Sequence, residues 1–311
     1  MEIQESQLIR KYHAKKVEKI AYGWSNDEKY HVTDAEGKQY IVRLCKKEAL
    51  EEKKQDFRII QELNKLDFEM SQAIEVGYSE ELDKTYMVLT WVDGEMMNQC
   101  VSSFEEDVQF RIGVEAGQIQ RKIHQVTVNP IDLPKKSRVA KRLKQLEEYI
   151  ACPDRVKDDE QVIQYVRENI GLLEHATAVY KHGDFHLGNL ILTPDKKVGV
   201  IDFDRIGCGE GYEEFYKLQA FEVEVSIPFA VGKLKGYFGE EPPEEFWKIQ
   251  KLYVAHSSLY SIKWAEEFGQ DDVDGMVERY CMAADDYDNF RLLVPKWFSA
   301  NTKRFPLSLQ Q

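Results

Sequence analysis

The segment from His182 to Asp202 constrains the fold most, because it predicts short strands in a half of the chain whose pattern is otherwise helical. It reads His182-Gly-Asp-Phe-His-Leu-Gly-Asn189, followed by an apolar run at 190–192, a turn at 193–195 and a second apolar run at 198–201. This order predicts a loop, a strand, a hairpin turn and a second strand. Such a hairpin would bring Asp202 back beside the loop that carries Asp184 and Asn189.

Two carboxylates and an amide gathered at strand ends suit a magnesium–phosphate site. Mg²⁺ takes hard oxygen ligands and usually keeps several waters. A single aspartate that caps a turn, or an asparagine that satisfies loop carbonyls, is the simpler interpretation of one such residue. The combination of Asp184, Asn189 and Asp202 favours a functional site. We expect His182 to bond backbone carbonyls and hold the loop, since no third ligand suggests that it joins His186 in a zinc site.

The first 92 residues have a β-rich pattern that contains one helix. Strands are predicted at 16–22, 29–33 and 39–45, and the small, polar residues at 34–37 suit a hairpin between the last two. Apolar residues spaced along one face predict a helix within 47–66. Two further strands are predicted at 74–78 and 86–92.

Helical patterns dominate after Asp93-Gly94, a dipeptide typical of turns. Helices are predicted at 104–124, 139–150, 161–179, 213–230, 244–268 and 273–290, and only the segment described first is expected to add strands. The sequence therefore predicts an α+β fold of two lobes. A small β-rich lobe would span 1–93, and a larger, mainly helical lobe would span 94–311.

Composition excludes several classes of function. A net charge of −13 argues against binding to nucleic acid, whose phosphates call for a basic surface. The same charge is compatible with a small cationic substrate, although acidity also simply favours solubility. The 5 cysteines form no Cys-x-x-Cys motif, no apolar run is long enough to span a bilayer, and the polar N-terminus is not typical of a signal peptide. We therefore expect a cytoplasmic protein without membrane association.

The His182–Asn189 motif coupled to Ile201-Asp202, after a β-rich lobe with one helix, resembles the aminoglycoside phosphotransferase family. These proteins are small-molecule kinases with a protein-kinase-like fold, related to choline kinases. The resemblance implies ATP or GTP as co-substrate and Mg²⁺ as cofactor. It implies that Asp184 takes or orients the proton of the acceptor hydroxyl, and that Asn189 and Asp202 hold the metal.

The resemblance also implies contacts to the nucleotide phosphates. The turn at 23–26 takes the place of the family's phosphate-covering loop, where Ser25 or Asn26 could add a side-chain contact. Arg43 stands where the family has its ATP-binding lysine, and arginine keeps a charge and a fork for phosphate oxygens.

Two more features complete the expected nucleotide site. Asp56 best matches the helix acid that pairs with the strand cation, and Glu52, one turn earlier, is the alternative. The segment 86–95 resembles the hinge, so backbone groups around Thr90 and Val92 are expected to read the nucleotide base.

The expected acceptor is a hydroxyl of a small cationic molecule, either an aminoglycoside-like antibiotic or a metabolite. Carboxylates of the helical lobe would pair with its ammonium groups, and acidic clusters occur at 266–267, 271–274 and 285–288. The alternative is a catalytically silent nucleotide-binding sensor or scaffold of the same fold. A protein kinase is disfavoured, because the Gly-rich loop, Asp-Phe-Gly and Ala-Pro-Glu signatures are missing.

Overall fold

A computed structural model describes residues 3–21, 27–135, 137–174 and 177–306. The chain is divided into two compact units. The first combines Met1–Glu95 with His182–Asp184 and Asn189–Gly207, and the second combines Met96–Lys181 with Phe185–Gly188 and Cys208–Gln311. Among the described residues, no helix is long and apolar enough to cross a membrane.

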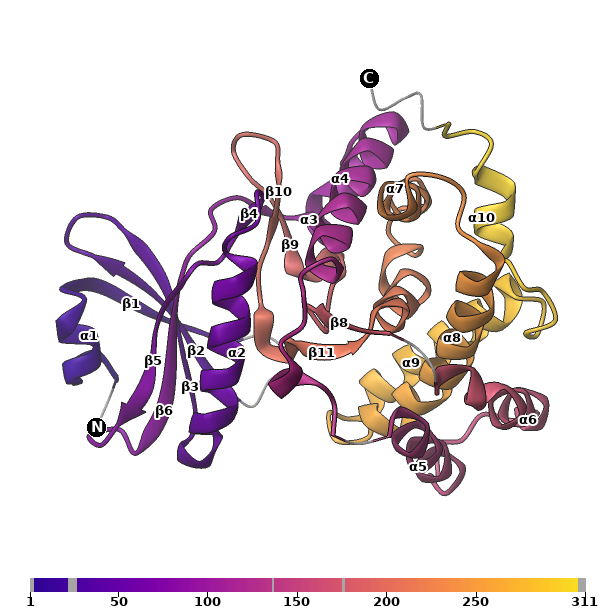
Figure 1. The fold of residues 1–311 in the computed structure, drawn as a ribbon, viewed down its shortest axis with the longest axis horizontal. Coiled ribbons are helices and arrows are strands. Elements are labelled where there is room, and N and C mark those ends of the chain that lie inside the picture. Colours follow the sequence, from indigo (N-terminus) through magenta and orange to yellow (C-terminus); the bar gives the residue numbers. More distant parts are fainter. Residues whose placement is uncertain (1–2, 22–26, 136, 175–176, 307–311) are drawn as a thin grey trace. The chain divides into compact units, whose positions relative to one another are not determined.

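The first unit is built on an antiparallel sheet with the strand order β1-β2-β3-β6-β5 (Figure 1). Its strands are β1 (Ala14–Ile20), β2 (Glu28–Asp34), β3 (Gln39–Lys46), β5 (Ala73–Ser79) and β6 (Lys84–Thr90). Gly37 has a φ of 87° in the turn between β2 and β3, a conformation that glycine adopts without strain. Strands β2 and β3 pair antiparallel on either side of this turn, so the hairpin predicted here is confirmed.

Helix α2 (Leu50–Leu63) follows β3 and contacts β5 and β6. Ile59, Ile60 and Leu63 form its buried face, as the apolar spacing predicts. A short helix, α1 (Gln7–Lys11), precedes β1 and was not predicted. Its Leu8 and Ile9 join the apolar core with residues of β2 and β3.

The segment 182–202 contains the predicted hairpin, and all of it except Phe185–Gly188 belongs to this β-rich unit. Strands β9 (Leu190–Leu192) and β10 (Val198–Val200) form an antiparallel hairpin. Strand β10 also pairs in parallel with the short β4 (Glu69–Met70). The hairpin is thus tied by backbone hydrogen bonds to the chain that leads from α2 to β5.

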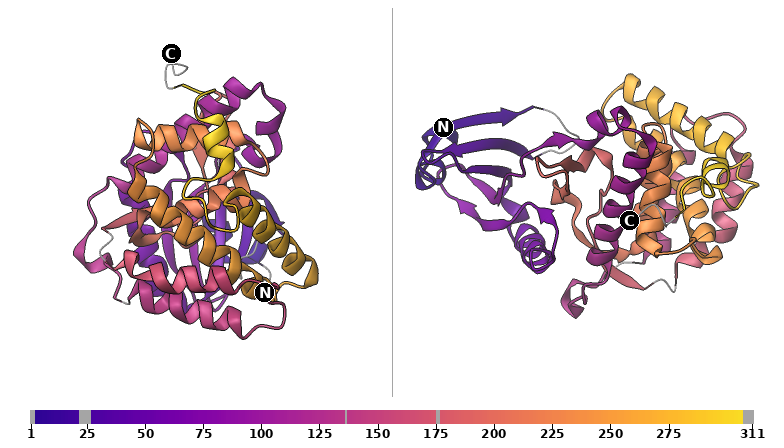
Figure 2. Two further views of the ribbon diagram at one scale, coloured as in Figure 1. Left: turned by 90° about the vertical axis from the view of Figure 1, so that its right-hand side faces the viewer. Right: turned by 90° about the horizontal axis from the view of Figure 1, so that it is seen from above.

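The second unit is mainly helical (Figure 2). Its helices are α3 (Met97–Cys100), α4 (Glu106–His124), α5 (Arg138–Ile150), α6 (Glu160–Asn169), α7 (Ile227–Phe238), α8 (Glu244–Ala265), α9 (Gln270–Asp286) and α10 (Lys296–Asn301), and β7 (Glu95–Met96) leads into it. Together with the sheet and helix of the first unit, this confirms the predicted α+β fold.

Helices α4 and α7 lie side by side, because glycines let their backbones approach closely. A Cβ added at Gly117 would lie 2.0 Å from the carbonyl oxygen of Lys233, and one added at Gly236 would lie 2.1 Å from that of Val114. Gly113 and Gly232 make equally close approaches one turn away. Any side chain at these positions would push the two helices apart.

Two expectations for the helical half were wrong. The stretch 213–230 is not one helix: a 3₁₀ turn (Gly211–Phe215) and a π turn (Leu218–Glu222) precede α7. Ser226 caps α7 by accepting from Phe229 N, and a proline in the first turn starts the helix there. The stretch 161–179 is α-helical only to Asn169 in α6. A 3₁₀ turn (Ile170–Leu173) follows, and Ala178 begins β8 (Ala178–Lys181), which pairs with β11 (Gly207–Glu210).

Candidate functional site

His182 organises the loop that carries Asp184. It is fully buried, its Nε2 lies 2.9 Å from the carbonyl oxygen of Ile201, and its Nδ1 accepts from Asp184 N at 3.2 Å. Because Nδ1 accepts, the proton of the neutral ring lies on Nε2 and is donated to Ile201. The expected structural role of His182 is confirmed, and the ring fixes Asp184 relative to the residue that precedes Asp202.

Gly183 is required by the same loop. Its φ is +85°, and a Cβ at this position would lie 1.9 Å from the carbonyl oxygen of Arg205. A side chain here would meet both backbone strain and a direct clash. The glycine in the His-Gly-Asp motif is therefore explained by the close passage of the chain after Asp202.

Asn189 is hydrogen-bonded to Asp184 and to Ile201, the residue before Asp202. Its side-chain Nδ2 donates to the carbonyl oxygen of Asp184 at 2.9 Å, and its own carbonyl accepts from Ile201 N at 3.1 Å. The amide nitrogen is committed to Asp184, so the amide oxygen is the atom that can ligate a cation. Asp202 directly follows Ile201 and has a φ of 61°, an uncommon conformation that is often found at functional sites.

Asp202 contacts two cations from neighbouring strands. Arg43 Nη1 on β3 lies 2.5 Å from Asp202 Oδ1, and Lys29 Nζ on β2 lies 3.0 Å from Oδ2. Burial alone would raise the pKa of Asp202, but Arg43 and Lys29 lower it below its ordinary value. The carboxylate is therefore held in its charged form, the form that binds metal ions.

A second layer of charges surrounds Arg43. Its Nη2 lies 2.7 Å from Asp204 and 3.3 Å from Asp27. Burial alone would lower the pKa of this guanidinium, but the carboxylates of Asp202, Asp204 and Asp27 raise it. Burial, reinforced by the charge of Asp204, raises the pKa of Asp27. Arg43 is thus clamped by three carboxylates.

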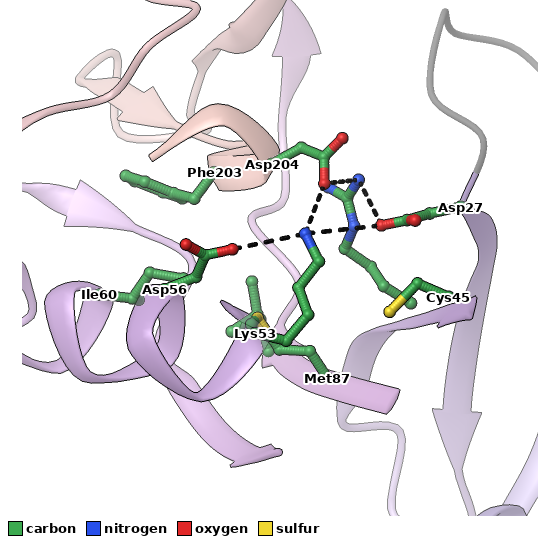
Figure 3. A pocket seen from close by; sticks show the side chains of 10 residues that line it. Asp27, Cys45, Lys53, Asp56, Ile60, Met87, Phe203 and Asp204 are labelled. Atoms are coloured by element: carbon green, nitrogen blue, oxygen red, sulfur yellow. Dashed lines mark hydrogen bonds and ion pairs between the residues drawn. The ribbon is translucent and has the colours of Figure 1, made fainter. Parts of the chain in front are cut away.

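Lys53 on α2 extends this network toward the helix (Figure 3). Its Nζ lies 3.1 Å from Asp204, 3.4 Å from Asp56 and 3.9 Å from Asp27. Burial raises the pKa of Asp56 to about 7, against the lowering effect of Lys53. Asp56 is buried and Glu52 is exposed. Asp56 thus pairs with Lys53, and its expected pairing with Arg43 stays a prediction.

These charges line a small pocket in the first unit. Its apolar side is made by residues of α2, β3 and β6 and by the residue after Asp202, namely Ile60, Cys45, Met87, Leu89 and Phe203. A site with charged groups on one side and apolar side chains on the other is suited to a ligand with a charged part and an apolar ring.

The other residues predicted to contact the nucleotide are Thr90, Val92, Ser25 and Asn26. Thr90 N donates to the carbonyl of Gln72 at 2.9 Å, and Trp91 N donates to that of Gln39 at 3.1 Å, so both donors serve backbone contacts in this unit. Val92 is buried. Ser25 and Asn26 lie outside the described residues.

Four charged residues of the site were missed from the sequence: Asp27, Lys29, Lys53 and Asp204. The position of one of them could have been predicted from the strand register. Once the hairpin turn at 34–37 is fixed, the register places Lys29 directly opposite Arg43. The contacts of Lys53 and Asp204 join distant parts of the chain and leave no local pattern.

The donor set fits Mg²⁺ better than a metal bound by protein groups alone. Among the described residues, no group of three or more His, Cys, Asp or Glu side chains is arranged to hold a metal ion. Mg²⁺ is usually bound through one or two carboxylates together with substrate phosphates and water. Asp202 and the amide oxygen of Asn189 are compatible with that mode.

The chain is similar to one family of known proteins. A family model described as "Phosphotransferase enzyme family" (APH) matches residues 16–247, more than half of the chain. A search of curated proteins finds no match.

Several solved structures have the same fold. The amicoumacin kinase hAmiN, in complex with AMP-PNP, Ca²⁺ and Ami, gives a TM-score of 0.68 at 15% identity over 94% of this chain and 95% of its own. The gentamicin–APH(2'')-IIa complex gives 0.66 at 16% over 92% and 96%. The GDP complex of aminoglycoside 2'-phosphotransferase-IIIa gives 0.68 at 14% over 87% and 92%. These similarities establish a kinase-like α+β fold.

Proposed function

The chain belongs to the phosphotransferase enzyme family, and we propose that it is a small-molecule kinase that transfers the γ-phosphate of ATP or GTP to a hydroxyl group. The observation that carries this proposal is the hydrogen-bonded connection of Asp184, Asn189 and Ile201-Asp202. Phosphoryl transfer requires positioning, charge neutralisation and an oriented nucleophile. These residues supply one candidate base and two candidate metal ligands.

Each residue has a distinct role in the proposed reaction. The oxygen of the acceptor hydroxyl bonds to the γ-phosphorus while the nucleoside diphosphate leaves. Asp184 accepts the proton that this hydroxyl loses. Asn189 and Asp202 would hold Mg²⁺, which would neutralise charge on the phosphates. Arg43 adds a positive charge on the phosphate side, and Ser25 and Asn26 are expected to add uncharged side-chain contacts.

The nucleotide and the acceptor are assigned to different parts of the chain. Residues 1–93 form the proposed nucleotide-binding lobe, with the base read by backbone groups around Thr90 and Val92. Residues 94–311 form the proposed catalytic and substrate-binding lobe. Asp184, Asn189 and Asp202 belong to this sequence range, although they pack with the β-rich unit.

The proposed acceptor is cationic. The chain has a net charge of −13, which favours positively charged small molecules electrostatically. Structures of similar fold include a kinase bound to gentamicin and another bound to kanamycin, so aminoglycosides belong in the first panel of acceptors. Amino alcohols and amino sugars share the combination of a hydroxyl with an ammonium group and complete that panel.

The test is a coupled assay of nucleoside diphosphate release with Mg²⁺ and either ATP or GTP over this acceptor panel. With an active acceptor, Asp184→Asn should lower turnover by about 10²–10⁴-fold, the typical contribution of a positioned base, and leave nucleotide affinity unchanged. Asp195→Asn, at an exposed position in the β9–β10 turn, is the matched control and should retain full turnover. Unchanged turnover in Asp184→Asn would refute the base assignment. Nucleotide binding without turnover on any acceptor would favour the silent sensor instead.

A further inference from the structure

Lys29 occupies an unusual position opposite Arg43. Strands β2 and β3 are antiparallel, and Lys29 and Arg43 are direct partners in their register. The next pair along, Tyr30 and Val42, belongs to the apolar core. Since side chains alternate between the two faces of a sheet, Lys29 and Arg43 share the face opposite to that core. Both are largely buried, with exposed fractions of 8% and 5%.

Two cations at directly opposed positions destabilise a sheet unless an anion lies between them. Asp202 provides that anion, with one carboxylate oxygen near each cation. The two cations differ in their remaining partners. Arg43 is also paired with Asp204 and Asp27, whereas Asp202 is the one carboxylate partner of Lys29 among the described residues.

The number of carboxylate partners of each cation matters, because acids outnumber cations in this cluster. The cluster holds three cations, Lys29, Arg43 and Lys53, and the four acids Asp27, Asp56, Asp202 and Asp204. A triphosphate is strongly anionic, so it needs a cation that is not shared among several structural ion pairs. Arg43 and Lys53 are each shared among three carboxylates. Lys29 has a single carboxylate partner and a flexible side chain, properties that allow a lysine to act as a mobile point charge.

We propose that Lys29 is the main phosphate-binding cation of this protein, and that Arg43 chiefly holds Asp202, Asp204 and Asp27 in position. This inference rests on the proposed function, because it assigns a residue to the nucleotide side of that site. If Asp202 ligated a metal ion, the ammonium group of Lys29 would be released to pair with phosphate oxygens. Lysine is a common phosphate ligand in nucleotide sites, where it acts as a point charge.

The test measures binding by isothermal titration calorimetry, with Mg²⁺ and a series of adenosine, AMP, ADP and AMP-PNP, repeated with the guanosine series. Lys29→Met should weaken the binding of the triphosphate analogue by about 10- to 100-fold, the typical effect of losing a charged hydrogen bond. It should change nucleoside affinity by less than about twofold, because the nucleoside carries no phosphate for Lys29 to contact. Lys29→Arg should keep most of the affinity, since it keeps the charge.

Lys19→Met is the matched control. Lys19 lies on β1 opposite Tyr30, and its side chain is 60% exposed, so it is a lysine of the same sheet on the other face. Its removal should leave every affinity unchanged. If Lys29→Met fails to fold, Lys29→Gln replaces it, because glutamine keeps a polar side chain next to Asp202.

Each result decides between the two proposals. Wild-type protein that binds none of the nucleotides would overturn the proposed function together with the role of Lys29. If wild-type protein and a folded Lys29→Met variant bind the triphosphate analogue equally tightly, the role of Lys29 alone is overturned. A loss of equal size for adenosine and for AMP-PNP would also overturn it, because that loss would not depend on phosphate.

Discussion

Lys233 offers a quantitative test of how the helical unit is held together. This residue of α7 is fully buried, and its Nζ donates to Glu222 Oε1 at 2.8 Å and to the carbonyl oxygen of Phe185 at 3.0 Å. Glu222 is fully buried as well. Lys233→Met keeps most of the side-chain length but leaves the carboxylate without its cation. Breaking a buried pair on one side typically costs about 3–5 kcal/mol.

Urea unfolding followed by tryptophan fluorescence measures this change. The double variant Lys233→Met/Glu222→Gln should recover most of the loss, because a neutral amide replaces the uncompensated charge. Lys248→Met is the matched control: Lys248 pairs with Glu244 at 2.6 Å, but the two side chains are 52% and 71% exposed. An exposed pair of this kind contributes about 0.2–1 kcal/mol.

The reasoning would be refuted if Lys233→Met destabilised the protein no more than Lys248→Met does. It would also fail if adding Glu222→Gln lowered stability further, because the loss would then not come from an unpaired carboxylate. A second readout is turnover on an identified acceptor. Phe185 directly follows Asp184, so loss of the Lys233 hydrogen bond should lower kcat more than it changes nucleotide affinity.

Two further predictions concern the first unit. Gly183→Ala should destabilise the protein by about 1–3 kcal/mol, because its φ of +85° disfavours a side chain and the new Cβ would lie 1.9 Å from the carbonyl oxygen of Arg205; an unchanged melting temperature would contradict this. Burial raises the pKa of Asp56 from 3.8 to about 7. A carboxyl group whose pKa is higher in the folded state makes the protein lose stability as pH rises from about 4 to about 7. The Asp56→Asn variant lacks this titrating carboxyl group. Its free energy of unfolding minus that of wild type should therefore increase between about pH 4 and about pH 7, by at most roughly 4 kcal/mol. Parallel pH profiles of the two proteins would disprove the assignment.

Much of the architecture was predictable, because strands and helices of ordinary length leave periodic patterns. The hairpin between β2 and β3 and the one between β9 and β10 both follow from apolar runs flanking a turn. Helix α2 follows from its buried face of Ile59, Ile60 and Leu63. Short elements such as β4 leave no such pattern, since two residues cannot define a period.

The helical half shows a different limit. Apolar spacing runs almost without interruption from Glu213 to Ala230, yet the chain changes from a 3₁₀ turn to a π turn before α7 begins. Ser226 and the proline after it mark the true start of α7. Periodicity alone could not show this boundary, whereas the capping signal was present in the sequence.

The candidate site was predicted as a set of positions but not as a set of partners. The connection of Asp184 and Asn189 to the residue before Asp202 follows from the hairpin that returns the chain. The pairing of Lys53 with Asp204 depends instead on where α2 lies relative to the chain after β10. Such ion pairs are decided by tertiary packing, which no local pattern encodes.

The assignment of His182–Asp184 and Asn189–Gly207 to the β-rich unit bears on protein engineering. The backbone passes between the two units after Glu95, Lys181, Asp184, Gly188 and Gly207. A fragment cut after Glu95 would lack β9 and β10, leaving β4 without its partner strand. A chimera that replaces the helical unit of this protein would therefore need several junctions, and would have to keep His182–Asp184 and Asn189–Gly207 together with the original sheet.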